Sequence, residues 1–350
     1  MAIKRILVTG SSGLIGSEVV NFFCNINFEV IGIDNNMRKV FFGEKGSIIN
    51  NLKRLKEENE NFKNYEIDIR DRLLINNLIK EKKPEIIIHT AAQPSHDKAS
   101  EIPFIDFEVN AIGTLNLLEA VRIHCKDTVF IHLSTNKVYG DTPNLLDLEE
   151  LRTRFEYKGA LFKKGINEKL SIDQSTHSLF GVSKTSADLL VQEYGRYFNI
   201  PTCCLRGGCL TGPSHSGVKL HGFINYLIRS NLFKTEYTIN GYKGKQVRDN
   251  IHSFDVANFI YLFSQNPKIS SVYNIGGGYK NSISILEAIN KIESISDIKM
   301  NYKYSETSRI GDHICYYSDL SKLKKDYPNW KITKSLDDIF EDTYKAIKYK

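Results

Sequence analysis

The stretch that decides the fold is Lys4-Arg-Ile-Leu-Val-Thr-Gly10-Ser-Ser-Gly13-Leu-Ile-Gly16. Residues 4–9 form a short apolar run that predicts a buried strand. The apolar residues that follow recur at helical spacing: Ile15, Val19, Phe22 and Phe23. The glycines therefore mark a tight turn from a strand into a helix. Such a turn lets the backbone approach a phosphate group, and the helix N-terminus presents free N–H groups to its charge.

An acidic residue closes the next expected strand. Asp34 ends residues 29–34 and is placed to bond the ribose hydroxyls of a dinucleotide. A carboxylate there would repel a 2′-phosphate, which favours NAD over NADP, although the nearby Arg38 weakens that preference. The strand, the glycine turn, the helix and the acid agree, so we expect an NAD-type dinucleotide at this turn.

Further strands and helices alternate along the chain. We expect strands at residues 4–9, 29–34, 65–69, 85–90, 128–133 and 201–206, and helices at 109–123 and 181–197. This alternation predicts an α/β fold, a Rossmann-type doubly wound parallel sheet with a smaller C-terminal substrate-binding region. We place the NAD-binding domain at 1–205 with a returning segment at about 246–278, and the substrate-binding region at 206–245 and 279–350. Residues 50–64 predict a solvated helix or loop.

Composition excludes several classes of protein. The chain has 350 residues, and its 47 basic and 41 acidic residues give a net charge of +6 without a basic stripe, so nucleic-acid binding is not expected. No apolar run is long enough for a membrane span, and the first residues do not resemble a signal peptide. The six cysteines lack the spacing of a metal site or a disulfide framework. We expect a cytoplasmic protein without a metal.

The glycine spacing Gly-x-x-Gly-x-x-Gly resembles the extended short-chain dehydrogenase/reductase superfamily. Other segments resemble it in the same order: Asp68-Ile-Arg70, His89-Thr-Ala-Ala-Gln93, Asn110-Ala-Ile-Gly-Thr114, Ser134-Thr-Asn-Lys-Val-Tyr-Gly140 and Arg248-Asp249-Asn-Ile-His252. Within the superfamily the chain is most similar to the CDP-paratose 2-epimerase (tyvelose epimerase) group, through Ser134-Thr-Asn-Lys-Val-Tyr-Gly-Asp141, Gly244-Lys-Gln-Val-Arg-Asp249, Tyr273-Asn-Ile-Gly-Gly277 and Asn35-Asn-Met-Arg-Lys-Val-Phe-Phe-Gly43. The similarity runs from residue 4 to about residue 315.

The resemblance implies an activity. Such enzymes retain NAD, oxidise a sugar hydroxyl, let the ketone present its other face and return the hydride. It therefore implies an NAD-dependent epimerase of a nucleotide-linked sugar, with a CDP-sugar and C2 favoured, acting as a homodimer in carbohydrate biosynthesis. A 4-epimerase, a dehydrogenase and a binding protein without turnover remain alternatives. The 4,6-dehydratases of the superfamily carry Asp-Glu after the threonine, whereas Thr135 is followed here by Asn136-Lys137, so dehydration is not expected.

The resemblance also implies site residues. Asp68 and Ile69 would flank the adenine, Lys184 would bond the nicotinamide ribose, and Arg248 would hold the substrate diphosphate. The implied cofactor set is Gly10, Ser12, Gly13, Leu14, Ile15, Gly16, Asp34, Asn35, Asn36, Arg38, Asp68, Ile69, Ala91, Ala92, Gln93, Asn110, Ser134 and Lys184. The implied substrate set is Lys137, Cys209, His221, Arg248, Arg309 and Asp312. Cys209 departs from the superfamily, whose members often have asparagine there.

One catalytic residue of the superfamily is missing. Its members use a tyrosine four residues before the lysine to exchange the hydroxyl proton, and a serine or threonine to bond the same hydroxyl. Thr135 and Lys184 are present, but Phe180 stands at the tyrosine position. The protein is then a natural variant with another base, an engineered variant that traps a complex, or a binder without turnover. The candidate bases are Lys184, Lys137, His177 and His221. His89 and His132 are expected to be hydrogen-bonded core residues.

Overall fold

The computed structural model describes residues 4–214, 222–308 and 311–349. Two compact units are present, each with a core of its own. Unit 1 consists of Met1–Val138, Leu179–Arg206 and Val256–Tyr273, and unit 2 consists of Tyr139–Ser178, Gly207–Asp255 and Asn274–Lys350. Residues 139–178, which the sequence places within the NAD-binding domain, have their contacts in unit 2.

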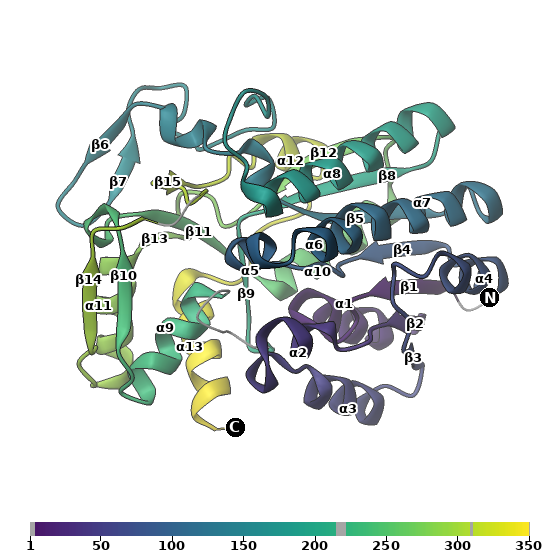
Figure 1. The fold of residues 1–350 in the computed structure, drawn as a ribbon, viewed down its shortest axis with the longest axis horizontal. Coiled ribbons are helices and arrows are strands. Elements are labelled where there is room, and N and C mark those ends of the chain that lie inside the picture. Colours follow the sequence, from purple (N-terminus) through teal and green to yellow (C-terminus); the bar gives the residue numbers. More distant parts are fainter. Residues whose placement is uncertain (1–3, 215–221, 309–310, 350) are drawn as a thin grey trace. The chain divides into compact units, whose positions relative to one another are not determined.

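Unit 1 is built on a seven-stranded sheet in the order β12-β8-β5-β4-β1-β2-β3 (Figure 1). Its strands are β1 Arg5–Thr9, β2 Glu29–Ile33, β3 Phe62–Tyr65, β4 Ile86–His89, β5 Val129–Thr135, β8 Thr202–Gly207 and β12 Ser271–Ile275. The pairs from β3 to β5 are parallel and in register, for example Leu7 with Ile31 and Ile87. The order reverses at β1, which is the arrangement of a doubly wound sheet and confirms the predicted fold class.

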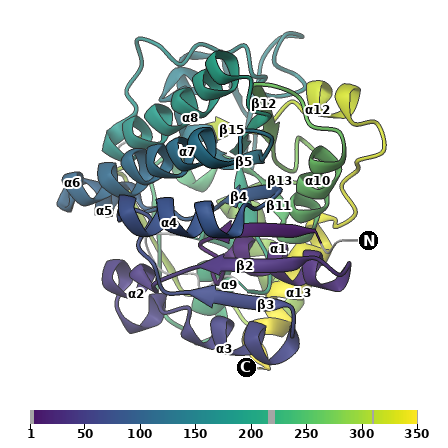
Figure 2. The same ribbon diagram turned by 90° about the vertical axis from the view of Figure 1, so that its right-hand side faces the viewer.

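Helices cover both faces of this sheet. They are α1 Leu14–Asn25, α2 Met37–Phe42, α3 Ile49–Glu58, α4 Arg72–Lys82, α5 His96–Glu101, α6 Pro103–Phe107, α7 Gly113–His124, α8 Ser178–Phe198 and α10 Ser253–Gln265. α4, α7 and α8 lie along the same face of the sheet (Figure 2), and they share one apolar cluster with the strands. α1 contacts α3, and the ring of Phe22 on α1 lies 5.7 Å from that of Tyr261 on α10. Near-continuous apolar strands are what a sheet buried on both faces requires.

Two expected elements differ from the observed ones. The third strand is Phe62–Tyr65 and not residues 65–69, because the chain turns after Tyr65: Ile67 bonds back to the Tyr65 carbonyl and Asp71 to that of Asp68. The helix expected at 109–123 begins with one π-helical turn, Glu108–Ile112, before α7. The stretch expected as a solvated helix or loop contains α3.

Unit 2 is assembled from smaller elements. Its strands are β6 Leu148–Glu150, β7 Phe155–Tyr157, β9 Cys209–Thr211, β10 Tyr237–Asn240, β11 Val247–His252, β13 Ser282–Ser284, β14 Tyr302–Ser305 and β15 Cys315–Tyr316. Its helices are α9 Phe223–Leu232, α11 Ile285–Ser296, α12 Ser321–Asp326 and α13 Leu336–Lys348. β11 pairs with β9, β13 and β15. α9, α11 and α13 form the apolar core with β10 and β13.

Within the described residues, no helix combines the length and apolarity that a membrane span requires. The same residues contain no group of three or more His, Cys, Asp or Glu side chains arranged to hold a metal ion. His221 and Arg309, two expected substrate contacts, lie outside the described residues.

Candidate functional site

The glycine turn between β1 and α1 is held in a conformation that larger residues would disrupt. Gly10 has φ of +66° and donates its N–H to the Ile33 carbonyl at 2.7 Å. A Cβ on Gly16 would lie 2.0 Å from the Gly10 carbonyl oxygen. Gly13 is the N-cap of α1, and Leu14 and Ile15 form its first turn. The first turn of α1 therefore lies against the glycine loop, with its N-terminal N–H groups directed along the helix axis.

Asp34 and Ser12 define the polar side of this turn. The Ser12 N–H donates to Asp34 Oδ2 at 3.0 Å, and the Asn36 N–H donates to Oδ1 at 3.0 Å. Burial raises the pKa of Asp34, although these two backbone hydrogen bonds oppose the shift. The buried Ser12 Oγ has no hydrogen-bond partner within the part of the chain that the structure describes. A buried hydroxyl in this position is ready for a ligand that accepts or donates a hydrogen bond.

Asn35 and Asp68 meet beside Asp34. Asn35 Nδ2 donates to Asp68 Oδ2 at 3.2 Å, and Arg70 binds the same carboxylate with Nε and Nη2 at 3.0 and 2.7 Å. Burial opposes ionisation of Asp68, but the bonds and charge of Arg70 outweigh it and hold the pKa below its usual value. Ile69 is buried in the core of unit 1. Arg70 belongs to the segment Asp68-Ile-Arg70, but the sequence did not predict its ion pair with Asp68.

Asn36 and Arg38 have mainly local contacts. Asn36 adopts a left-handed conformation, donates to Ser47 Oγ and accepts from the Ile48 N–H. The Arg38 guanidinium lies 5.0 Å from the centroid of the Phe42 ring, and burial lowers the pKa of Arg38 to about 10. The structure thus places Asn36 between β2 and α2, as the N-cap of α2, and it places Arg38 on α2.

A buried polar network joins the loop after β4 to α8. Gln93 Nε2 and Asn110 Nδ2 donate to Asp106 Oδ1 at 2.7 and 3.1 Å, and Ser183 Oγ donates to Oδ2 at 2.6 Å. The Gln93 N–H donates to Asn110 Oδ1, and Asn110 lies in the π-helical turn. The side chains of Gln93 and Asn110 therefore fix the half-buried Ala91 and Ala92, and nothing in the sequence pointed to Asp106 or Ser183 as their partners.

Lys184 is buried within unit 1. Its Nζ donates to the Leu133 carbonyl at 2.8 Å and lies 3.2 Å from His132 Nε2. Burial lowers the pKa of Lys184 to about 8, although the charges of Asp188, Cys204 and Asp106 act in the opposite direction. His89 bonds Thr9 and Thr114, as expected of a satisfied core residue. His132 differs from this expectation, because its Nδ1 has no partner among the described residues.

Thr135 and Phe180 complete the expected catalytic positions in unit 1. Thr135 ends β5, and its Oγ1 accepts the N–H of Lys137 at 3.2 Å. Phe180 is buried one helical turn before Lys184 on α8, with its ring 4.8 Å from that of His96. Ser134 Oγ donates to Asp188 Oδ2 at 2.5 Å, so the side chain of Ser134 faces α8. His177 belongs to unit 2, where its Nδ1 lies 3.0 Å from the Ser175 carbonyl.

The expected substrate residues of unit 2 lie on and beside β11. Arg248 is buried, donates to the Val247 carbonyl at 2.8 Å and forms an ion pair with Asp312 at 2.5 Å. Cys209 pairs with Asn250 in the β9–β11 ladder. The sequence resemblance placed Arg248 and Asp312 in one site, and the structure brings their side chains together.

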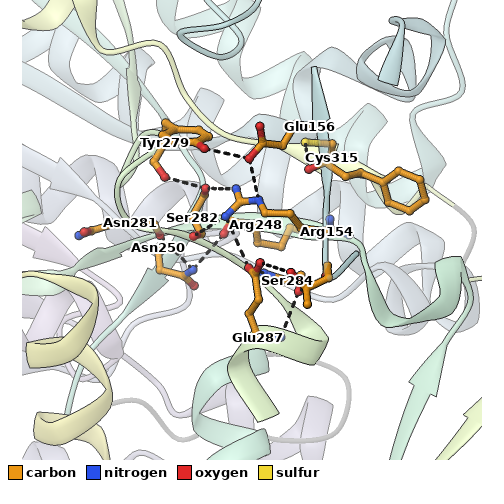
Figure 3. Close-up of polar contacts among 12 residues, drawn as sticks. Arg154, Glu156, Arg248, Asn250, Tyr279, Asn281, Ser282, Ser284, Glu287 and Cys315 are labelled. Atoms are coloured by element: carbon orange, nitrogen blue, oxygen red, sulfur yellow. Dashed lines mark hydrogen bonds and ion pairs between the residues drawn. The ribbon is translucent and has the colours of Figure 1, made fainter. Parts of the chain in front are cut away.

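The sequence did not indicate a second cluster of polar contacts, centred on the half-buried Arg154. Arg154 forms ion pairs with Glu156 at 3.2 Å and Glu287 at 3.5 Å, and it donates to Ser282 Oγ at 2.6 Å (Figure 3). Its guanidinium lies 5.3 Å from the Tyr279 ring centroid. These contacts fasten the β6–β7 hairpin to β13 and to the N-terminus of α11. Only the positive charge of Arg154 was visible in the sequence.

The comparisons with known proteins agree with this geometry. The model of the NAD dependent epimerase/dehydratase family matches residues 6–276. The chain is 31% identical to CDP-paratose 2-epimerase of Salmonella typhi, over 91% of this chain and 92% of that one. It is 29% identical to dTDP-glucose 4,6-dehydratase of Escherichia coli, over 92% and 88% of the two chains.

A solved structure extends the likeness to three dimensions. UDP-glucuronic acid 4-epimerase from Bacillus cereus, as a Tyr-to-Phe variant in complex with UDP-4-deoxy-4-fluoro-glucuronic acid and NAD, superposes with a TM-score of 0.80 and 28% identity. The match covers 99% of both chains. The likeness therefore extends over both units of the chain.

Proposed function

Because this chain belongs to the NAD dependent epimerase/dehydratase family, we propose that it interconverts C2 epimers of a CDP-linked sugar by transient oxidation. The membership confirms the family resemblance and the NAD cofactor that the sequence predicts. The protein is an NAD-dependent nucleotide-sugar epimerase of the extended short-chain dehydrogenase/reductase type. We further propose that the nucleotide is CDP, that the reaction takes place at C2 and that the enzyme serves carbohydrate biosynthesis in the cytoplasm. The 31% identity to CDP-paratose 2-epimerase supports this proposal.

The observation that favours epimerisation over dehydration is Thr135-Asn136-Lys137 at the end of β5. Elimination of water needs an acid and a base beside the sugar. Asn136 offers neither, and the segment contains no carboxylate. The same segment keeps a threonine hydroxyl for a substrate alcohol. The residues present therefore suit oxidation and hydride return.

The residues of unit 1 fit NAD. Gly10 and Gly16 leave space that a Cβ would fill, the Ser12 hydroxyl lacks a partner among the described residues, and Asp34 presents a carboxylate at the end of β2. The bound nicotinamide would accept a hydride from the sugar carbon and return it. Thr135 would orient the reacting hydroxyl.

The residues of unit 2 suit the nucleotide sugar. Arg248 would bind its diphosphate with a guanidinium that Asp312 holds in place. Lys137 and Cys209 are proposed sugar contacts. Because Cys209 is a weak hydrogen-bonding group, it would select an apolar or deoxygenated part of the sugar.

The test is direct. The purified protein is incubated with CDP-paratose and, separately, with GDP- and UDP-sugars, while products are followed by NMR and bound cofactor by absorbance. Epimer formation without net reduction of NAD supports the proposal. Net reduction indicates a dehydrogenase, and a 4-epimer product indicates the other epimerase.

A second candidate function, binding without turnover, is favoured by Phe180. This residue has no proton to exchange, and its ring is packed against His96. The variant Phe180→Tyr separates the possibilities. A large gain in turnover indicates a disabled site, whereas a loss indicates chemistry adapted to phenylalanine. Tight binding of CDP-paratose with no product in either protein supports the binder.

We further propose a homodimer. Apolar side chains are exposed along α6, α7 and α8, namely Phe104, Phe107, Ile123, Leu179, Val182, Leu189 and Tyr197. An apolar surface of this kind marks a protein–protein contact. Val182→Glu should convert a dimer into a monomer in sedimentation experiments, whereas Leu145→Glu, at an exposed leucine of unit 2, should not. A monomeric wild-type protein contradicts this proposal.

A further inference from the structure

The surroundings of Lys184 are unusual for a buried lysine. Its Nζ donates to the Leu133 carbonyl at 2.8 Å and lies 3.2 Å from His132 Nε2, which accepts from the ammonium when the imidazole proton is on Nδ1, and neither neighbour carries a negative charge. Burial together with the charge of Lys184 lowers the pKa of His132 well below its usual value, so this imidazole is neutral. A buried ammonium without a carboxylate partner is costly, and lysine responds by losing its proton.

The carboxylates that could balance Lys184 are bonded to other groups. Asp188 is held by Arg206 at 2.8 and 3.2 Å, by Ser134 and by Gln192. Asp106 is held by Gln93, Asn110 and Ser183. Two further titratable groups lie near Lys184: Cys204, and His89 on the far side of His132. Burial raises the pKa of the Cys204 thiol and lowers the pKa of the His89 imidazole, so both groups are neutral. The Lys184 ammonium therefore loses its proton more readily than that of an exposed lysine, at a pKa of about 8.

We propose that the Lys184 amine is the catalytic base that takes the place of the absent tyrosine, with His132 and the Leu133 carbonyl orienting it. The proposal rests on the epimerase function above. In the tautomer that carries the imidazole proton on Nδ1, His132 Nε2 and the Leu133 carbonyl accept two N–H bonds of Nζ, and the side chain takes a third tetrahedral position. The fourth position then holds the lone pair or the transferred proton. Phe180, one helical turn earlier, carries no competing acid.

Lys184 takes up and then returns the proton of the sugar hydroxyl, so the reaction neither gains nor loses a proton. As the hydride leaves the sugar carbon, the substrate O–H bond breaks and its proton forms an N–H bond on Lys184, which becomes an ammonium. The sugar becomes a ketone. When the hydride returns to the opposite face, Lys184 gives the same proton back to the oxygen. No further oxidant or reductant is needed. A base whose pKa lies near the working pH is the most effective one, which suits a lysine with a pKa of about 8.

The first experiment separates a base from a fixed cation. Lys184→Arg keeps a charge and hydrogen-bond donors but has no lone pair, so turnover of CDP-paratose should fall on the order of 10²–10⁴-fold while bound NAD is retained. Lys184→Ala, assayed at saturating NAD, should regain turnover with added ethylamine and not with guanidinium. Retention of more than about a tenth of turnover in Lys184→Arg, or equal rescue by guanidinium, overturns the proposal.

The second experiment needs no change at Lys184. The wild-type kcat should rise with pH through a midpoint near 8, since only the neutral amine accepts a proton. His132→Phe removes one acceptor of the ammonium, so the midpoint should move to lower pH and the plateau should fall roughly tenfold. His132→Gln, which still offers an oxygen, should largely restore both. His89→Gln is the matched control on the neighbouring ring, 5.0 Å away, and should leave the midpoint in place.

The outcomes distinguish a failure of the proposed epimerase function from a failure of the proposed role of Lys184. If the wild-type protein epimerises none of the CDP-, GDP- or UDP-sugars, the proposed function fails. If it epimerises one of them and its kcat is independent of pH between about 6 and 9.5, the proposed function stands and the role of Lys184 is refuted.

Discussion

The glycine turn of unit 1 and the Arg154 cluster of unit 2 are both polar, but they are built in opposite ways. In the turn, close approach is a property of the backbone at Gly10 and Gly16, and the hydroxyl of Ser12 has no partner among the described residues. In the cluster, the cation is already paired, because Arg154 faces the carboxylates of both Glu156 and Glu287 (Figure 3). The first arrangement is prepared for a ligand, whereas the second holds the protein itself together.

Arg248 lies between these extremes. It is buried, whereas Arg154 is half-buried, and the carboxylate partner of Arg248 among the described residues is Asp312 alone. A guanidinium has five N–H donors, so one carboxylate leaves capacity for a phosphate. Charge pairing alone thus does not separate a structural arginine from a ligand-binding one. What separates Arg154 from Arg248 is the number of carboxylates that each guanidinium contacts within the described residues, two for Arg154 and one for Arg248.

The largest effect is expected at the turn. In Gly16→Ala the new Cβ would meet the Gly10 carbonyl oxygen at 2.0 Å, so the loop must move by more than the site tolerates. NAD affinity should fall at least about 100-fold, measured as bound NAD per chain after purification and by titration. Gly207→Ala is the control, because Gly207 does not have a positive φ and a Cβ there would lie 3.3 Å from the nearest atoms, which belong to the Leu210 side chain. Full NAD occupancy in Gly16→Ala would show that the turn is not the cofactor site.

The next effect is expected at Arg248. Arg248→Met should raise KM for CDP-paratose about 100-fold and leave kcat within a few-fold, because the diphosphate that Arg248 would bind neither forms nor breaks a bond in the reaction. NAD content should not change. A loss of kcat at unchanged KM would instead assign Arg248 to the reaction itself, and the contrast with Arg154 would disappear.

The difference between the two regions also explains what the sequence could predict. The turn was predictable because a backbone requirement restricts residue type over a few adjacent positions, Gly10 to Gly16, and Asp34 follows at the end of the next strand. The Arg154 cluster was not, because Arg154 and Ser282 are 128 residues apart and their contact depends on the folded chain. The contact of Lys184 with His132 spans 52 residues and was missed for the same reason.

Local periodicity has a similar limit. The apolar pattern predicted a helix at 109–123, but the π-helical turn at its start accompanies hydrogen bonds that Asn110 makes to Gln93, Asp106 and Ser183. Those partners lie on other elements. The third strand was placed too late because Ile67 and Ile69 continue an alternating pattern, while the Arg70–Asp68 bond turns the chain there.

A smaller effect is expected at Arg154. Arg154→Met leaves Glu156 and Glu287 without their cation in a largely buried setting, and removal of one partner of such a pair is destabilising. The free energy of unfolding should fall by about 2 kcal/mol, measured by urea denaturation, with KM for CDP-paratose unchanged. A rise in KM as large as that of Arg248→Met would show that Arg154 also binds substrate.

The smallest effect is expected at Lys243, which serves as a surface counterpart of Arg154. Its Nζ reaches both carboxylate oxygens of Glu150 at 2.9 and 3.0 Å, so by distance alone it forms a better pair than Arg154 does. Its side chain is 66% exposed, however, and in water the attraction is largely offset by side-chain entropy and screening. Lys245 also contacts Glu150, so the carboxylate keeps a cation when Lys243 is replaced. Lys243→Met should therefore leave the urea midpoint unchanged within error. A shift as large as that of Arg154→Met would mean that distance, and not burial, decides how much an ion pair contributes in this protein.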